Sequence, residues 1–313
     1  MIENLIIIIP THNRQHYLRR VVKYYSSFPC RVYICDSSKV KAAVECSDNI
    51  TYRWVPQSYF YGKVLDVLNE TSADFYALSP DDDFLKLETL MECYEYLRKN
   101  NEFVMANGRQ YLFHKEYDMR LFYNPGTNGF KDKNVINNDR DGVKYFWKHY
   151  QNVLWSLFRR KAILNAFTVL ANSGFKNGNF VEIVLSIESL KLGSVFISDN
   201  PFNFMEINPS EHWGNTTLPI SWESYVKSSG LRKDIKTFYN FYNGDYVAKI
   251  SLRLHMGRPL IEICRLCYNR LRRLIGKLQS AKGKTVINEM SLPEAEDSIM
   301  VKRITVANKE MAE

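Results

Sequence analysis

Three successive carboxylates, Asp81 to Asp83, are the residues of this chain whose chemistry most needs an explanation. Adjacent like charges repel and raise one another's pKa unless a cation or hydrogen-bond donors compensate them. A divalent metal is the simplest compensation, because Mg²⁺ and Mn²⁺ prefer hard oxygen ligands and are commonly held by one or two carboxylates together with substrate phosphates. The alternative is a helix start, because acidic residues favour the first turn and an apolar-patterned segment follows at 85–99.

The secondary structure expected around the triplet favours a metal site over a helix start. Residues 5–9 are an unbroken apolar run, typical of a strand buried on both faces of a parallel sheet. Strands alternate with helices along this region, which indicates an α/β fold with a mainly parallel sheet and helices on both faces. We expect strands over 5–9, 31–35, 50–55 and 74–78, and helices over 14–27, 62–69 and 85–99. Ligands bind beyond the carboxyl ends of such strands, so loops 11–13, 36–38 and 81–83 are expected to form one site.

Four segments of this region carry a family resemblance when they are taken in order: Ile6-Ile-Ile-Ile-Pro-Thr-His-Asn-Arg14, Asp36-Ser-Ser38, Gly62-Lys63 and Phe75-Tyr-Ala-Leu-Ser-Pro-Asp-Asp-Asp-Phe84. Together they resemble the nucleotide-sugar-binding half of the family 2 glycosyltransferases with the Rossmann-like GT-A fold. The order of the four segments makes the match specific, whereas a single short motif would not. The resemblance implies that Thr11 and Asp36 hold the nucleoside of the donor.

The resemblance also assigns the metal and the diphosphate to an Asp-x-Asp motif. This motif maps to Asp81 and Asp83, with Asp82 between them as a further donor-binding residue. Many members of the family read Asp-x-Asp-Asp here, and an alignment on the last two acids would put Pro80 at the first position. The expected cofactor is Mn²⁺ or Mg²⁺, and which two carboxylates contact it stays open.

Five further side chains are candidates for the same site. His12 and Arg14 adjoin the nucleotide loop, and Arg14 can either pair with a phosphate or be a solvated residue of the first helical turn. Ser38 belongs to the second loop, and Lys63 at a helix start is suited to contact a phosphate or a uracil. His212 follows the last expected strand, over 195–197, in a loop where a neutral imidazole can complete a metal shell; the alternative is an ordinary surface histidine.

An inverting sugar transfer requires a carboxylate that removes the acceptor's proton as the acceptor oxygen attacks the anomeric carbon. Segments 155–162 and 179–193 resemble the acceptor side of the family, where an acidic residue opens a helix that ends in Gly. That acid maps to Glu182, although the family motif usually reads Glu-Asp or a lone Asp. The alternative role for Glu182 is a favourable charge at a helix N-terminus, and Glu188 is expected to be structural.

Positive charge is concentrated near the C-terminus. The net charge is +8, and between residues 227 and 284 there are 14 Lys or Arg against three acidic residues. Over about 259–278, apolar residues recur at steps of three and four with basic residues opposite, which predicts an amphipathic helix on an anionic membrane surface. The alternative is a helix packed on the main domain with solvated arginines. Nucleic acid is not expected, because no recognition motif accompanies the charge.

The overall composition is that of a soluble globular protein, with 45% hydrophobic and 24% charged residues. No apolar stretch approaches the roughly 18 residues of a membrane span, and Glu3 with Asn4 interrupts a signal-peptide start. The six cysteines lack the density of a disulfide scaffold and are expected to be reduced. We therefore expect a cytoplasmic protein, peripheral on the inner face of the cell membrane.

These observations predict a GT-A domain over 1–215 with a C-terminal helical extension. The domain divides into a nucleotide-sugar half (1–110) and an acceptor half (111–215), followed by a basic helical extension (216–284) and a polar tail (285–313). The expected activity is metal-dependent, inverting transfer from a nucleotide diphosphate sugar, with uridine implied by the resemblance.

The expected acceptor is a saccharide or lipid-linked molecule in bacterial surface polysaccharide or glycolipid synthesis. Two alternatives remain. A nucleotidyltransferase would carry a Gly-rich basic loop after the first strand, which residues 10–13 lack. The other alternative is an inactive, membrane-associated protein that only binds a nucleotide sugar.

Overall fold

The computed structural model describes residues 1–113, 121–123, 128–130, 132–207 and 220–256. Within them, ten strands form one mixed sheet in the order β3-β2-β1-β4-β9-β6-β10-β5, with β7 paired to β6 and β8 to β10. The strands are β1 (Ile2–Thr11), β2 (Cys30–Asp36), β3 (Ile50–Trp54), β4 (Phe75–Leu78), β5 (Phe84–Leu85), β6 (Phe103–Phe113), β7 (Leu121–Tyr123), β8 (Val135–Ile136), β9 (Leu157–Arg159) and β10 (Ser194–Glu206). The helices are α1 (Gln15–Tyr25), α2 (Phe60–Glu70), α3 (Leu87–Lys99), α4 (Arg140–Lys148), α5 (Arg160–Ser173), α6 (Phe180–Leu192), α7 (Trp222–Lys227), α8 (Ser229–Phe241) and α9 (Tyr246–Met256).

Six of these strands run in one direction. β1 is parallel to β2 and β4, β2 is parallel to β3, and β6 is parallel to β10. β9 runs antiparallel between β4 and β6, so β6 and β10 keep the direction of β4. The carboxyl ends of all six strands therefore lie at one edge of the sheet, which is where ligands of such folds bind.

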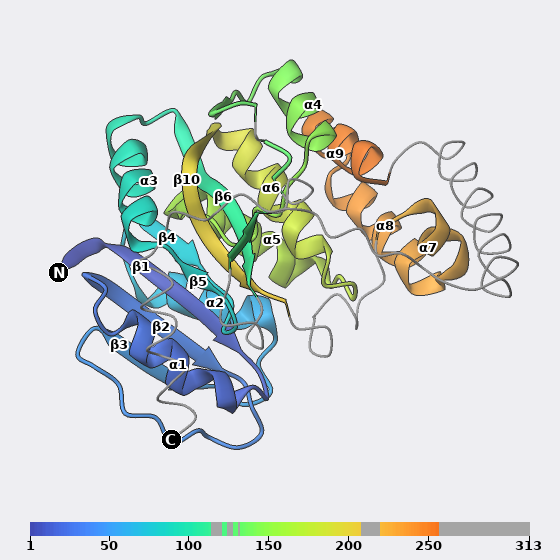
Figure 1. The fold of residues 1–313 in the computed structure, drawn as a ribbon. Coiled ribbons are helices and arrows are strands. Elements are labelled where there is room, and N and C mark those ends of the chain that lie inside the picture. Colours follow the sequence, from blue (N-terminus) through green and yellow to red (C-terminus); the bar gives the residue numbers. More distant parts are fainter. Residues whose placement is uncertain (114–120, 124–127, 131, 208–219, 257–313) are drawn as a thin grey trace, which may run out of the picture.

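β1 is buried from both sides, as its apolar run predicts. Ile6 and Ile8 belong to a core formed with α2, α5 and α6, whereas Leu5, Ile7 and Ile9 belong to a second core formed with α1 and α3. All five side chains are at most 2% exposed. The sheet thus carries helices on both faces, which confirms the expected fold class, and Figure 1 shows the layered arrangement.

The acid triplet does not open a helix. Residues 84–85 follow it as β5 and pair with residues 203–204 of β10. Helix α3 begins only at Leu87, and the acidic residue of its first turn is Glu88. The helix-start interpretation of the triplet is therefore wrong, because the chain after the triplet is used for sheet pairing before the helix begins.

β10 is much longer than the strand expected over 195–197. It pairs with β6, a strand that the sequence pattern does not indicate. Two polar residues of β6, Asn107 and Gln110, are buried, and both donate to the carbonyl oxygen of Asn152, at 3.3 and 2.6 Å. Such hydrogen-bonded polar residues interrupt the apolar pattern from which a buried strand is predicted.

Three helices, α7 to α9, follow the sheet over residues 222–256. α8 contacts α5, and α9 contacts α4 and α6, so these helices extend the molecule on the far side of α5 and α6 from β1–β3 (Figure 1). The amphipathic helix expected over about 259–278 and the tail over 285–313 lie outside the described residues. Every helix among the described residues is too short or too polar to cross a bilayer.

Candidate active site

The carboxyl ends of β1 and β4 bring Thr11 and the acid triplet together. The hydroxyl of Thr11 donates to Asp81 Oδ2 at 2.5 Å. Arg14, at the start of α1, donates from Nη1 to Asp81 Oδ1 at 2.7 Å and from Nη2 to Asp82 Oδ2 at 2.6 Å. Burial raises the pKa of Asp81 to about 6, although Arg14 acts in the opposite direction. One guanidinium therefore bridges two of the three carboxylates.

Asp36, at the end of β2, has hydrogen bonds to both of its carboxylate oxygens. Oδ1 accepts from the backbone N–H of Ser38 at 2.8 Å and from the Ser38 hydroxyl, while Oδ2 accepts from the Tyr52 hydroxyl at 2.7 Å. Asp36 is fully buried, and burial together with the bond to Asp36 raises the pKa of Tyr52 to about 12. These bonds hold the turn 36–38 in a fixed shape.

Lys63, in the first turn of α2, connects the first two loops. Its ammonium donates to the carbonyl oxygen of Thr11 at 2.6 Å and to the Ser37 hydroxyl at 3.0 Å. Burial lowers the pKa of this lysine to about 8, while nearby acidic groups, including Asp36 and Asp81, act in the opposite direction. Lys63 is therefore buried beneath the loops that follow β1 and β2, and its ammonium group holds these two loops together.

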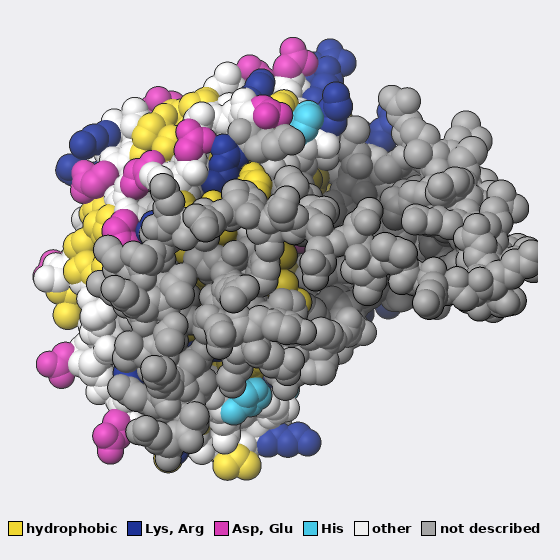
Figure 2. All heavy atoms as spheres, in the orientation of Figure 1, with side chains coloured by type: hydrophobic (Ala, Val, Ile, Leu, Met, Phe, Trp, Pro, Cys, Tyr) yellow, Lys and Arg dark blue, Asp and Glu magenta, His cyan; other side chains and the backbone are white. Residues whose placement is uncertain are grey.

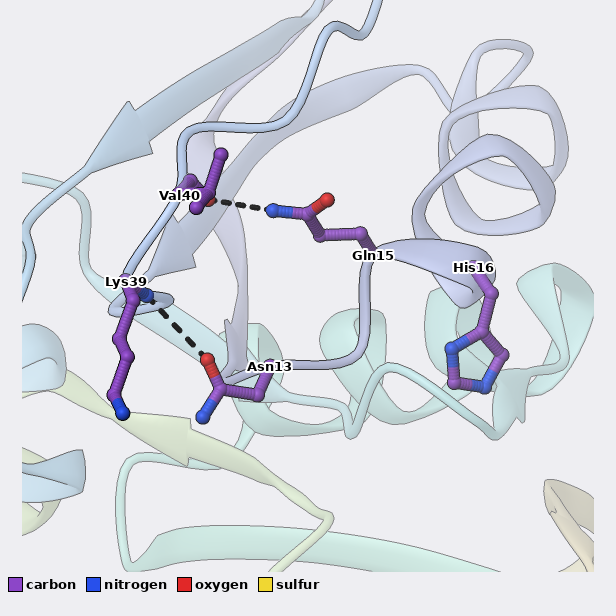
Figure 3. A pocket seen from close by; sticks show the side chains of 5 residues that line it. All are labelled: Asn13, Gln15, His16, Lys39 and Val40. Atoms are coloured by element: carbon purple, nitrogen blue, oxygen red, sulfur yellow. Dashed lines mark hydrogen bonds between the residues drawn. The ribbon is translucent and has the colours of Figure 1, made fainter.

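His12 and Asn13 form the outer edge of the site. His12 Nδ1 lies 3.1 Å from the Ser37 carbonyl oxygen and 3.0 Å from its hydroxyl, and the backbone N–H of Asn13 donates to Ser38 Oγ at 2.7 Å. Beside them is an open hollow of about 340 Å³, drawn in Figure 3, which is lined by Asn13, Gln15, His16, Lys39 and Val40. The hollow lies directly against the loops that were expected to hold the nucleoside.

The third carboxylate has different partners. Asp83 Oδ1 accepts from the backbone N–H of Glu206 at 2.8 Å, and the Glu206 carboxylate forms an ion pair with Arg20 at 2.5 Å. Arg20 also donates to the carbonyl oxygen of Asp82 at 2.8 Å. Burial raises the pKa of Asp83 well above its usual range, and the charges of Asp82 and Glu206 add to this shift. Asp83 therefore anchors the triplet to the end of β10.

No sequence motif points to Arg20 or Glu206 as residues of the site. Arg20 is completely buried and lies among the apolar residues of α1, near Tyr17, Val21 and Tyr24. A cation at such a position requires a buried acceptor, so the helical pattern contained a signal that Arg20 has a special partner. Nothing in the local sequence points to Glu206 as that partner.

The donor set around the triplet fits a divalent cation only in part. Asp81 and Asp82 offer the hard oxygen ligands that Mg²⁺ and Mn²⁺ prefer, but Arg14 already neutralises both. Asp83 is bonded to β10, and His212 lies outside the described residues. The described part of the chain contains no group of three or more His, Cys, Asp and Glu placed to hold a metal. A cation at Asp81 and Asp82 would have to replace Arg14 as their partner.

Glu182 belongs to a second set of contacts, in the first turn of α6. Burial raises the pKa of its carboxyl to about 7, and the Tyr150 hydroxyl and the backbone of Val153 lower it in part. A carboxyl with this pKa is close to half ionised at neutral pH, which suits a general base.

The sheet register places Glu182 at the edge where the triplet lies. α6 leads directly into β10, and Glu182 is twelve residues before Ser194, about 18 Å along the helix axis. The pairings of β4 with β9, of β9 with β6 and of β6 with β10 put Ile197 of β10 level with Leu78, the last residue of β4. Ile197 lies only about 10 Å from the start of β10. The N-terminus of α6 therefore reaches beyond the carboxyl end of β4.

The loop 150–156 connects the two sets of residues. Its first residues adjoin Glu182, and its Trp155 ring packs edge-on against Phe60 at the start of α2, with 6.4 Å between the ring centroids. The first turn of α2 also carries Lys63. The structure thus brings Thr11, His12, Arg14, Asp36, Ser38, Lys63 and the triplet into one network, with Glu182 in a neighbouring group.

Comparison with known proteins identifies the fold. No protein family model matches the chain. No curated protein matches it in sequence. The structure is similar to residues 1–349 of TarS, a glycosyltransferase of S. aureus, with a TM-score of 0.50 and 11% identity over 82% of this chain and 72% of that one. For the same fragment in complex with UDP-GlcNAc the TM-score is 0.51, with 12% identity over 80% and 72% of the two chains. The shared architecture is a GT-A fold.

Replacing Arg20 with Met is expected to leave the Glu206 carboxylate buried without its cation. We expect the substitution to lower the free energy of unfolding by about 3–5 kcal/mol, as for other broken buried ion pairs. The double variant Arg20→Met/Glu206→Gln should recover part of that loss, because it removes the uncompensated charge. Urea unfolding of both variants measures the difference, and equal stability of the single and double variants would contradict the assignment.

Proposed function

We propose that this chain is a glycosyltransferase that takes its sugar from a nucleotide diphosphate donor. The observation that carries the proposal is the network at the carboxyl ends of β1, β2 and β4, where Thr11, Lys63 and Asp81 are joined by direct hydrogen bonds. This is the edge at which α/β folds bind nucleotides. The GT-A architecture supports a sugar donor over other nucleotides.

The proposed donor is a UDP-sugar. Support comes from the solved complex of TarS with UDP-GlcNAc, whose fold this chain shares, and from the resemblance of the first hundred residues to the family 2 enzymes. In this proposal the nucleoside occupies the hollow beside Asn13 and Lys39 in Figure 3, next to the turn that Asp36 fixes. The diphosphate then extends toward Arg14 and the triplet.

The proposed transfer proceeds with inversion in a single displacement. The acceptor hydroxyl loses its proton to Glu182 while its oxygen attacks the anomeric carbon, and the bond from that carbon to the diphosphate oxygen breaks. Negative charge grows on the leaving diphosphate, so cationic groups beside the triplet stabilise the transition state. A divalent cation, when bound by Asp81 and Asp82, would supply part of that charge neutralisation.

Two alternatives make different predictions. A nucleotidyltransferase needs donors that cradle a triphosphate after the first strand, whereas Thr11 in this loop uses its hydroxyl to bind Asp81. An inactive scaffold would bind the donor but would not need a tuned carboxyl, and Glu182 with a pKa of about 7 favours an enzyme over such a scaffold.

Calorimetric titration with UDP, GDP and CMP, each with and without Mn²⁺, tests the donor proposal. We expect UDP to bind more tightly than the other two nucleotides. In the presence of Mn²⁺, UDP should bind at least tenfold more weakly to Asp81→Asn, because that change removes a carboxylate that would hold the cation beside the diphosphate. Glu95→Gln on the exposed face of α3 is the matched control and should bind as the unmodified protein does. Absence of UDP binding under all conditions would contradict the proposed donor.

Replacing Glu182 with Gln tests the catalytic base. We expect this variant to retain UDP-sugar binding and to lose at least a hundredfold in transfer rate, because the amide cannot accept the proton. Transfer by the unmodified protein should increase as the pH rises through about 7, since only the ionised carboxylate is a base. Glu188→Gln, in the same helix, is the control and should keep this pH profile. Normal transfer by Glu182→Gln would refute the assignment.

We also propose that the protein works on the cytoplasmic face of the membrane, on a saccharide or lipid-linked acceptor of surface polysaccharide or glycolipid synthesis. Support comes from α8 and α9, whose exposed residues include Arg232, Lys233, Lys236, Lys249 and Arg253. The acids nearby are engaged: Asp234 is buried, and Asp245 pairs with Lys191. By contrast, Figure 2 shows basic and acidic side chains close together over α3, where Arg98 pairs with Glu95.

Co-sedimentation with lipid vesicles tests this surface. We expect binding to vesicles that contain phosphatidylglycerol, weaker binding at high salt, and no binding to neutral phosphatidylcholine, because each surface cation contributes about 1 kcal/mol near an anionic membrane. The double change Lys233→Glu/Lys236→Glu should weaken binding more than tenfold, and Lys99→Glu on α3 should not. Equal binding of both variants would rule out α8 as the contact.

A further inference from the structure

Arg14 occupies the carboxylates that a divalent cation would use. Its two terminal nitrogens contact Asp81 and Asp82 at 2.7 and 2.6 Å, and each contact is an ion pair as well as a hydrogen bond. A planar guanidinium matches two acceptor oxygens better than a single point charge does. A free metal ion must therefore compete with a resident cation that is already well placed.

We propose that Arg14 keeps a free divalent cation away from Asp81 and Asp82 until the diphosphate of the donor draws the guanidinium away. Metal and nucleotide then bind as a coupled pair, and Arg14 passes from the carboxylates to the phosphates. This inference rests on the proposed function, because it requires a diphosphate ligand at this edge of the sheet.

Charge explains why the diphosphate is needed. Two ionised carboxylates bridged by one guanidinium keep a net charge of −1, half of what they carry alone, and the guanidinium repels a second cation at contact distance in a partly buried site. A diphosphate adds several negative oxygens, to which Arg can bind with two parallel hydrogen bonds. Once Arg14 has moved, Asp81 and Asp82 have lost their cationic partner, and both carboxylates attract a metal.

The two arginines of the site differ in their freedom to move. The side chain of Arg14 is 22% exposed and lies at the start of α1, so it can turn outward to a ligand. Arg20 is fully buried and holds both Glu206 and the carbonyl oxygen of Asp82. The backbone of the triplet therefore stays in place when Arg14 leaves, and the vacated carboxylates keep their positions.

The test measures Mn²⁺ binding to the full chain by electron paramagnetic resonance, with and without UDP. For the unmodified protein we expect Mn²⁺ to bind at least tenfold more tightly when UDP is present, and by linkage Mn²⁺ must strengthen UDP binding by the same factor. In the absence of UDP, Arg14→Gln should bind Mn²⁺ at least tenfold more tightly than the unmodified protein does. The factor by which UDP strengthens Mn²⁺ binding should therefore be smaller in this variant.

Two further variants provide the controls. Arg19→Gln removes the same charge from an exposed position of α1 and should leave Mn²⁺ binding unchanged. Arg14→Lys keeps the positive charge but lacks the planar guanidinium, so its affinity for free Mn²⁺ should lie between those of the unmodified protein and Arg14→Gln. Arg14→Lys also serves as the test variant if Arg14→Gln does not fold. The inference is overturned if neither Arg14 variant gains affinity for free Mn²⁺. Failure of the unmodified protein to bind UDP at all would instead overturn the proposed function.

Discussion

Compensation of the acid triplet by two arginines of α1 and by the backbone of β10 is the interaction on which the site depends. Arg14, at the start of α1, donates hydrogen bonds to the carboxylates of Asp81 and Asp82. Arg20, in the middle of α1, donates to the carbonyl oxygen of Asp82. Asp83 instead accepts from the backbone at the end of β10, beside the ion pair of Glu206 and Arg20. Each carboxylate of the triplet thus has a hydrogen-bond donor, without which three adjacent negative charges would repel one another.

The same contacts join the two halves of the sheet. α1 belongs to the second core, to which β1 and β2 also contribute, and β10 is the last long strand of the sheet. Since Arg20 pairs with Glu206, the ends of β1, β4 and β10 are held at one place. Lys63 fixes the loops after β1 and β2 in a similar way, from the opposite face of the sheet. A site assembled from four separate segments therefore has a rigid base, as precise positioning of a nucleotide requires.

Burial shifts the pKa values of Glu182 and Lys63 in opposite directions. Burial makes ionisation of the Glu182 carboxyl less favourable, and it makes protonation of the Lys63 amine less favourable. Glu182 is consequently suited to exchange a proton near neutral pH, while Lys63 keeps its hydrogen bonds to Thr11 and Ser37.

Local sequence determined much of this arrangement: the buried run 5–9, the alternation of strands and helices, and the polar residues after β1, β2 and β4 all follow from patterns within a few residues. Those patterns were sufficient to place Thr11, Asp36 and the triplet at one edge. Tertiary structure alone decided that the triplet precedes a strand, that Arg14 bridges Asp81 and Asp82, and that Arg20 meets Glu206. Periodicity reports which face of an element is buried, but the partner of a buried charge is chosen by packing between segments that lie far apart in the chain.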